Sequence, residues 1–142
     1  MVVLLHDIDI LTWLWHDAEI YSLKTDWAKD GELSVRLRCK MNPDEDQQPL
    51  RELGIQSALL DVYFQNTLTL KTTTYGCYSA RDVVYHWEII GASPLLDELR
   101  DKFRMKIEGL IHHHIQCSGS TLDIVCTNIG LEEIPKLEVA GC

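Results

Sequence analysis

The sequence predicts an α+β fold, in which a mainly antiparallel β-sheet of about seven strands carries one clear helix and one or two weaker helices packed on it. Two observations lead to this prediction. Segments with the period-two alternation of strands outnumber segments with helical periodicity, and short turn signals separate them. The length of 142 residues, with 46% hydrophobic and 25% charged side chains, suits one globular domain spanning residues 1–142.

The clearest strand is expected between Leu33 and Met41. One face of this segment would be apolar and the other polar, as in a strand that lies between a core and water. The apolar set is Leu33, Val35, Leu37, Cys39 and Met41, and the polar set is Glu32, Ser34, Arg36, Arg38 and Lys40. The basic row in the polar set is expected to face carboxylates on a neighbouring strand, although it could also bind a phosphate.

Further strands are expected where β-branched and aromatic residues cluster between turn residues. They begin after Ala18 and cover residues 58–64, 68–75, 83–90, 110–117 and 121–128. In segment 83–90, strict alternation puts Tyr85 and Trp87 on one face and leaves bulky residues on both faces, which indicates a central or covered strand. Residues 118–120 would form the turn of a hairpin, and residues 42–49 a loop.

The most secure helix is expected over residues 94–108. Ser93 supplies a hydroxyl N-cap, Pro94 suits the first helical position, and apolar residues then recur at helical spacing as far as Gly109. A weaker helix is expected at residues 9–16, where large apolar side chains are dense. Residues 134–142 are expected to be a flexible tail.

Charge and cysteine content narrow the classes of function. The formal charge of -9 and the isoelectric point of about 5.0 repel phosphate backbones and anionic lipid headgroups, so neither nucleic acid nor membrane is an expected partner. The 5 cysteines form an odd set without CxxC spacing, which argues against a disulfide framework and against a zinc ribbon. No apolar stretch approaches the roughly 20 residues of a membrane span, so a cytoplasmic location is expected.

Sequence motifs for catalysis and for cofactors are missing from the chain. Neither GxGxxG nor GxxxxGK[ST] occurs, which argues against nucleotide binding. The neighbouring His16 and Asp17 could serve general acid-base catalysis, but adjacent residues on a strand point to opposite faces, and no serine or cysteine occupies a nucleophile motif. The sequence therefore leans away from an enzyme, and no cofactor is expected.

The most conspicuous polar cluster is the triplet His112-His113-His114 inside an expected strand. Alternation would place His112 and His114 on one face and His113 on the other. Two imidazoles two residues apart on a strand can chelate a metal, and His86 or His16 could complete the site after folding. The alternative is two solvated histidines and one that is buried against the core and makes a hydrogen bond.

Three short motifs lie along most of the chain: WHDAEI at residues 15–20, VYHWEI at residues 84–89 and HIQCSGSTLDIV at residues 114–125. Together they resemble a group of small uncharacterised bacterial proteins that includes immunity proteins of polymorphic toxin systems. The resemblance implies a bacterial, non-catalytic protein that neutralises a toxin by binding it. The acidic field of the chain would then steer it towards a basic toxin.

A partner-binding surface is expected at the acidic loop Asp44, Glu45 and Asp46 and at the aromatic residues Trp15 and Tyr78. A third interpretation, beside toxin binding and metal binding, is a structural or oligomeric domain without an activity of its own. A β-rich chain with edge strands can pair with a second copy, so a homodimer is compatible with the sequence. The sequence favours the first of these, a non-catalytic protein-binding domain of immunity type, and keeps a metal-binding module or metal-dependent enzyme and a structural domain as alternatives.

Overall fold

A computed structural model describes residues 3–4, 17–29, 31–41, 48–74, 82–103 and 109–134. This described part of the chain contains nine strands and two helices. The strands are β1 (Val3–Leu4), β2 (Glu19–Trp27), β3 (Leu33–Lys40), β4 (Leu59–Gln65), β5 (Thr69–Thr74), β6 (Asp82–Ile90), β7 (Ile111–Cys117), β8 (Ser120–Cys126) and β9 (Asn128–Glu133). The helices are α2 (Gln48–Glu52) and α3 (Pro94–Phe103).

The strands form one sheet in the order β1-β9-β4-β3-β2-β6-β7-β8-β5. Neighbours pair antiparallel throughout, which confirms the predicted α+β fold with a mainly antiparallel sheet. Strands β2 to β8 correspond to the expected ones, and β1 and β9 were not predicted. The last expected strand, 121–128, in fact ends at Cys126, because Thr127 turns the chain by donating its N–H to the carbonyl of Gln65 at 3.1 Å.

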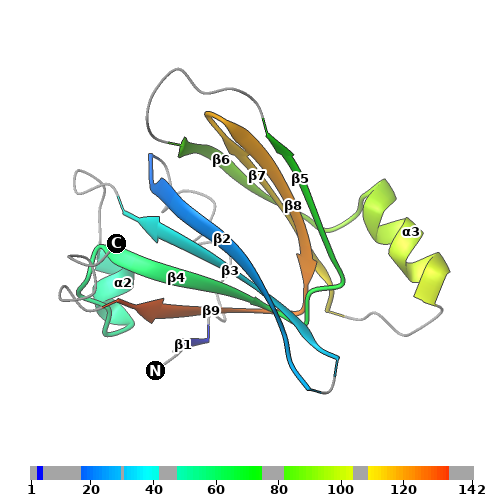
Figure 1. The fold of residues 1–142 in the computed structure, drawn as a ribbon, viewed down its shortest axis with the longest axis horizontal. Coiled ribbons are helices and arrows are strands. Elements are labelled where there is room, and N and C mark those ends of the chain that lie inside the picture. The colour runs from blue at the N-terminus through cyan, green and yellow to red at the C-terminus, as the bar shows by residue number, and fades with distance from the viewer. Residues whose placement is uncertain are drawn as a thin grey trace.

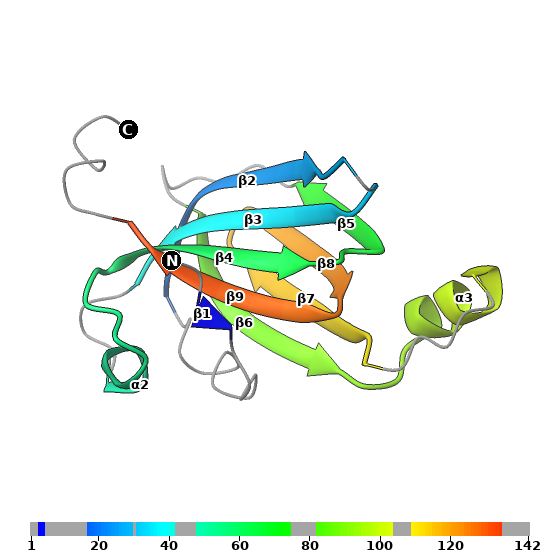
Figure 2. The same ribbon diagram turned by 90° about the horizontal axis from the view of Figure 1, so that it is seen from below.

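The sheet folds over so that its two halves face each other (Figures 1 and 2). The halves join where β2 pairs with β6, at Glu19 opposite Val83 and Ile20 opposite Asp82. Inward side chains of both halves form one buried cluster, which includes Leu37, Leu60, Phe64, Trp87, Ile115 and Ile124. Because strand side chains alternate, the other half of the side chains is left on the outer faces of the sheet.

Both strands at this junction contain a register irregularity. The extra residue is Tyr21 in β2 and Tyr85 in β6, and these two side chains are 53% and 58% exposed. The irregularity changes the phase of alternation in β6, so that Val84 and Trp87 are both buried. The prediction that Tyr85 and Trp87 share a face is therefore wrong, whereas the predicted central position of β6 is confirmed.

Strand β3 has the alternation that its sequence predicts, with Val35, Leu37 and Cys39 buried. On its outer face, the guanidinium of Arg38 donates to both carboxylate oxygens of Asp61 on β4, at 2.9 Å and 3.1 Å. Asp61 is only 3% exposed, and a bidentate arginine is the partner that best compensates a buried carboxylate. The basic row thus faces a carboxylate on the neighbouring strand, as expected.

The two helices lie at opposite ends of the sheet (Figure 1). α3 starts where the sequence predicts, since the hydroxyl oxygen of Ser93 accepts a hydrogen bond from the N–H of Leu96 at 3.1 Å. Its buried residues Leu96 and Leu99 pack against Leu110 and Val125 at one end of the β7–β8 pair. Neither described helix is long and apolar enough to cross a membrane.

Two boundaries differ from the predictions, and three predicted segments fall outside the described residues. Gln48 and Pro49 open α2 instead of ending a loop, because the side chain of Leu50 is buried in the core and anchors this turn. Ile134, the first residue of the expected tail, is buried and donates its N–H to Leu59 at 3.0 Å. The expected helix at 9–16, the end of the long helix at 104–108 and residues 135–142 lie outside the described part.

His113 belongs to an aromatic cluster in the core. Its ring lies edge-on to Phe64 and Trp87, with centroid distances of 5.4 Å and 5.9 Å, and its Nδ1 accepts a hydrogen bond from the indole N–H of Trp87 at 3.1 Å. The residue is 0% exposed, and burial, together with the neighbouring His112, lowers its pKa to about 3. One histidine of the triplet is therefore a neutral core residue with a hydrogen bond.

The stability of the fold should depend on pH through His113. The unfolded chain binds a proton near the ordinary histidine pKa, whereas the folded chain does not until about pH 3, so stability is lost as the pH falls below about 6.5. Between pH 7 and pH 5 this loss should be about 2 kcal/mol. Urea unfolding at pH 7 and at pH 5 measures this loss of stability, and in His113→Phe it should be smaller by that amount than in the unchanged protein. An equal loss of stability in both proteins would contradict a neutral buried His113.

Candidate metal centre

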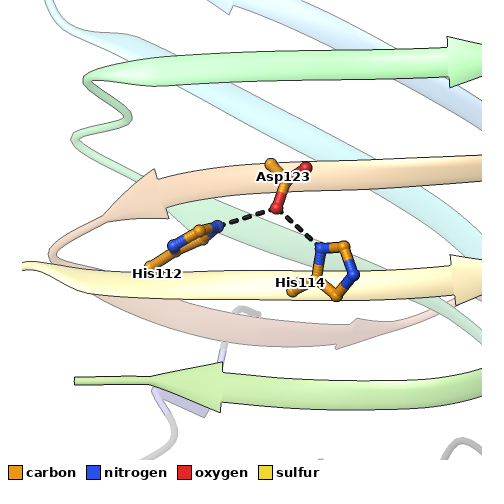
Figure 3. Close-up of side chains that lie close together, drawn as sticks. All are labelled: His112, His114 and Asp123. Carbon is orange, nitrogen blue, oxygen red and sulfur yellow. Dashed lines mark hydrogen bonds and ion pairs between the residues drawn. The ribbon is translucent and has the colours of Figure 1, made fainter. Parts of the chain in front are cut away.

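The pleat of β7 separates the three histidines. His113 points into the core, and His112 and His114 lie on the outer face of the sheet, as the alternation predicts. On the neighbouring strand β8, Asp123 is the direct register partner of His114, so its side chain stands on the same face. The hairpin thus brings two imidazoles and one carboxylate together on one surface (Figure 3).

One carboxylate oxygen connects the two rings. Oδ1 of Asp123 lies 2.8 Å from Nε2 of His112 and 2.7 Å from Nδ1 of His114, as the dashed lines in Figure 3 mark. A carboxylate can only accept, so each of these nitrogens donates its N–H to it. Burial by itself raises the pKa of Asp123, but the hydrogen bonds from His112 and His114 outweigh burial and hold the pKa below its ordinary value.

The remaining ring nitrogens also have partners. Nδ1 of His112 lies 2.9 Å from Oγ of Ser93, the residue that caps α3, and Nε2 of His114 lies 3.4 Å from the side-chain amide nitrogen of Gln116. These contacts orient both rings from behind. The hydroxyl of Ser93 can accept from a ring N–H, as the supports of metal-ligating histidines do, whereas the amide nitrogen of Gln116 can only donate. The orientation of His112 is the more constrained, because its side chain is 7% exposed against 24% for His114.

A surface pocket opens beside His112 and Asp123. Its volume is about 360 Å³, and the walls that surround His112 and Asp123 come from the start of α3 and from β5, with Ser93, Leu95 and Glu98 on one side and Lys71 on the other. Lys71 is the register partner of Asp123 on β5. Solvent and small molecules can therefore reach the carboxylate and the first imidazole from this side.

The three residues have the chemistry of a divalent-metal ligand set. Zinc binds imidazole nitrogen and carboxylate oxygen at about 2.0–2.2 Å, which places tetrahedral ligand atoms about 3.3–3.5 Å apart. The available ligand atoms of His112, His114 and Asp123 lie within 4.8 Å of one another. Metal binding would therefore require the three side chains to rotate out of their hydrogen-bonded positions. Three protein ligands would leave at least one coordination position open towards the pocket.

The sequence identified two of these three residues. His86 lies on the same outer face, opposite Gln116, but the described cluster of ligand atoms does not include it, and His16 lies outside the described residues. Asp123 was missed, and the expected turn at 118–120 would not have revealed it, because counting outwards from three turn residues pairs Asp123 with Ile115. The structure has a two-residue turn, 118–119, which shifts the register by one and pairs Asp123 with His114.

The residues expected to bind a protein partner are not described. Trp15, Asp44, Glu45, Asp46 and Tyr78 all lie outside the described part of the chain. Other exposed aromatic residues are present on the described surface, and they are Tyr21, Trp27 and Tyr85.

The described thiols are unsuited to nucleophilic chemistry. Burial raises the pKa of Cys117 and of Cys126 to about 12, and it raises the pKa of the fully buried Cys39 as well. A nucleophilic cysteine needs a lowered pKa, because the thiolate is the reactive form. These three cysteines are therefore structural residues of the core.

Replacing Asp123 by asparagine should destabilise the fold at neutral pH. The lowered pKa of Asp123 means that its charged form stabilises the folded chain above the ordinary carboxyl pKa, and this contribution disappears as the pH falls through the lowered value. Asp123→Asn should reduce the free energy of unfolding by about 1–2 kcal/mol at pH 7.

Urea unfolding at pH 7 and at pH 3 measures this effect, and the difference from the unchanged protein should shrink at the lower pH. Asp97→Asn, on the exposed surface of α3, is the matched control and should change stability by less than about 0.5 kcal/mol. A deficit of Asp123→Asn that stays the same at both pH values would contradict the assigned charge of Asp123.

Two imidazoles and one carboxylate form a set of borderline and hard ligands that suits zinc and neighbouring divalent transition metals. The set is held by two adjacent strands and by contacts from Ser93 and Gln116, so it does not depend on a long loop for its position. Comparison of the chain with protein-family models, with curated proteins and with solved structures finds no match in any of the three.

Proposed function

We propose that the chain is a metal-binding protein that holds a divalent transition metal, with zinc as the first choice, through His112, His114 and Asp123. The observation that carries the proposal is the convergence of both imidazoles on one carboxylate oxygen, at 2.8 Å and 2.7 Å. Both imidazoles already point at the third candidate ligand, the carboxylate of Asp123, from two adjacent strands. A metal would take the place of the two protons that the rings donate to this carboxylate.

An open coordination position is the second property of the proposed centre. Structural zinc usually has four protein ligands, whereas a centre with three keeps a position for water or another small ligand. The position here would face the pocket lined by Lys71 and by the first turn of α3. The proposed role is therefore binding of a metal together with an exchangeable ligand.

Zinc titration of the tag-free protein tests the proposal. Isothermal titration calorimetry should show one zinc per chain, and His112→Ala and His114→Ala should each weaken binding at least 100-fold, because each removes one of three ligands. His86→Ala is the matched control, since His86 lies on the same face outside the cluster, and it should bind like the unchanged protein. Equal binding by all three variants would contradict the assigned site.

A second candidate function is the binding of a protein partner, as an immunity-type inhibitor of a basic toxin. The observation in its favour is Trp27, which is 69% exposed at the end of β2, where the hairpin to β3 turns. Tryptophan is among the residues that most often contribute the largest share of binding energy in protein interfaces. The net charge of -9 also favours encounter with a basic protein.

Binding to the protein encoded beside this chain's gene tests the second candidate. If that protein is a toxin and Trp27 is a central contact, Trp27→Ala should weaken binding by about 30-fold or more, the effect of losing about 2 kcal/mol. Thr73→Ala, on the exposed strand β5, is the control and should leave the dissociation constant unchanged. No measurable binding, or equal binding by both variants, would count against an interface at Trp27.

A further inference from the structure

We infer that Ser93 is a positioning residue of the metal centre, and that it couples the occupation of the centre to the first turn of α3. The inference rests on the proposed metal site. It goes further by assigning a role to a residue that binds neither the metal nor its open ligand, and by connecting the centre to a helix that contributes no ligand of its own.

The hydroxyl of Ser93 contacts both the candidate ligand His112 and the first turn of α3. Its oxygen lies 2.9 Å from Nδ1 of His112 and accepts the N–H of Leu96 at 3.1 Å. Both partners are deeply buried, since His112 is 5% and Leu96 is 0% exposed. One side-chain oxygen therefore belongs at the same time to the N-cap of α3 and to the support of a candidate metal ligand.

The direction of the hydrogen bond to His112 follows from its other nitrogen. Nε2 must donate to Asp123, because a carboxylate has no proton to give. A neutral imidazole carries one N–H, so Nδ1 of the same ring is an acceptor. In the metal-free chain Ser93 therefore donates its O–H to His112, while its oxygen accepts from Leu96.

A metal at the centre would reverse this hydrogen bond. To bind through Nε2, His112 must release that proton and carry its single N–H on Nδ1, so the number of protons on the ring is unchanged. Nδ1 then donates to Ser93, whose oxygen accepts from both His112 and Leu96, and the hydroxyl proton is free to turn towards the pocket. Ser93 can serve both states because a hydroxyl both donates and accepts.

The packing under α3 extends the connection. Val125 is the register partner of His112 on β8, and it contacts the buried leucines Leu96 and Leu99 of α3. The base of the helix and the candidate ligand thus share two neighbours, Ser93 and Val125. Because coupling between two processes is reciprocal, a metal that tightens the contact of His112 with Ser93 also stabilises the first turn of α3, and loss of the cap weakens metal binding.

Substitutions at Ser93 separate this role from that of a simple helix cap. Glycine is tolerated at an N-cap at a cost of a few tenths of a kcal/mol, whereas alanine is not. Both remove the hydroxyl that holds His112. We expect Ser93→Gly and Ser93→Ala to weaken zinc binding about 10-fold or more, the usual effect of losing such a support, and Ser93→Thr, which keeps the hydroxyl, to stay within about threefold of the unchanged protein.

Competition titration with a zinc chelator measures these affinities, and ¹⁵N NMR of the histidine side chains provides an independent readout. In the unchanged protein the proton of His112 should move from Nε2 to Nδ1 when zinc is added. If Ser93 only caps the helix, Ser93→Gly will bind zinc as the unchanged protein does, and that result overturns the inference while leaving the metal site intact. Failure of the unchanged protein to bind zinc overturns both.

Discussion

The arrangement of the candidate site depends on the register of β7 in the sheet. His113 and Ile115 are 0% exposed on its inner side, and the pairing of Trp87 with Ile115 fixes the strand against β6. A shift by one residue would place His112 and His114 in the core and expose His113 and its apolar neighbours. The register that buries the core is thus the same one that presents two imidazoles on the outer face.

The histidine triplet of β7 therefore contributes both to the core, through His113, and to the surface site, through His112 and His114. Burial keeps His113 neutral, as the fall of its pKa to about 3 indicates, and the indole of Trp87 satisfies its Nδ1. On the other side of the same strand, the buried His112 and the partly exposed His114 share Asp123. A run of three histidines is compatible with a stable strand because only the middle one, His113, is placed in the core. There its Nδ1 accepts a hydrogen bond from the indole of Trp87.

The support of the site comes from both of its flanks. Ser93 orients His112 and belongs to the helix cap, while Gln116 contacts His114 from the same strand. The other half of the sheet contains a comparable use of paired charge, since Arg38 and Asp61 compensate each other on its outer face. In the described part of the chain, the buried carboxylate of Asp61 thus accepts hydrogen bonds from an arginine. The partly exposed carboxylate of Asp123 instead accepts hydrogen bonds from two histidines, which could also bind a metal.

Much of the fold could be predicted from the sequence because alternation and turn chemistry are local signals. The alternation of β3, the cap at Ser93 and the presence of a hairpin between β7 and β8 are all encoded within a few residues, although its turn is 118–119 and not 118–120. The irregularity at Tyr85 could not be predicted, because it arises where two halves of a bent sheet meet and not from the side chains of β6 alone. β9 was missed for a similar reason, since its pairing with β4 lies more than sixty residues away in sequence.

The candidate site was predictable to the extent that it follows from one strand. The shared face of His112 and His114 required only the period of two, and Asp123 required the register of the hairpin as well. The contact of Ser93 with His112 depends on how α3 returns to the sheet, which no local pattern specifies. Residues grouped by tertiary packing were for this reason the ones that the sequence did not reveal.

X-ray absorption spectroscopy at the zinc edge tests the central claim most directly, on tag-free protein loaded with one equivalent of zinc. Two imidazole nitrogens and oxygen ligands at about 2.0–2.2 Å are the predicted first coordination shell. The imidazole contribution should fall from two rings to one in His114→Ala. A shell with sulfur at about 2.3 Å, or one without imidazole, would contradict a centre built from His112, His114 and Asp123.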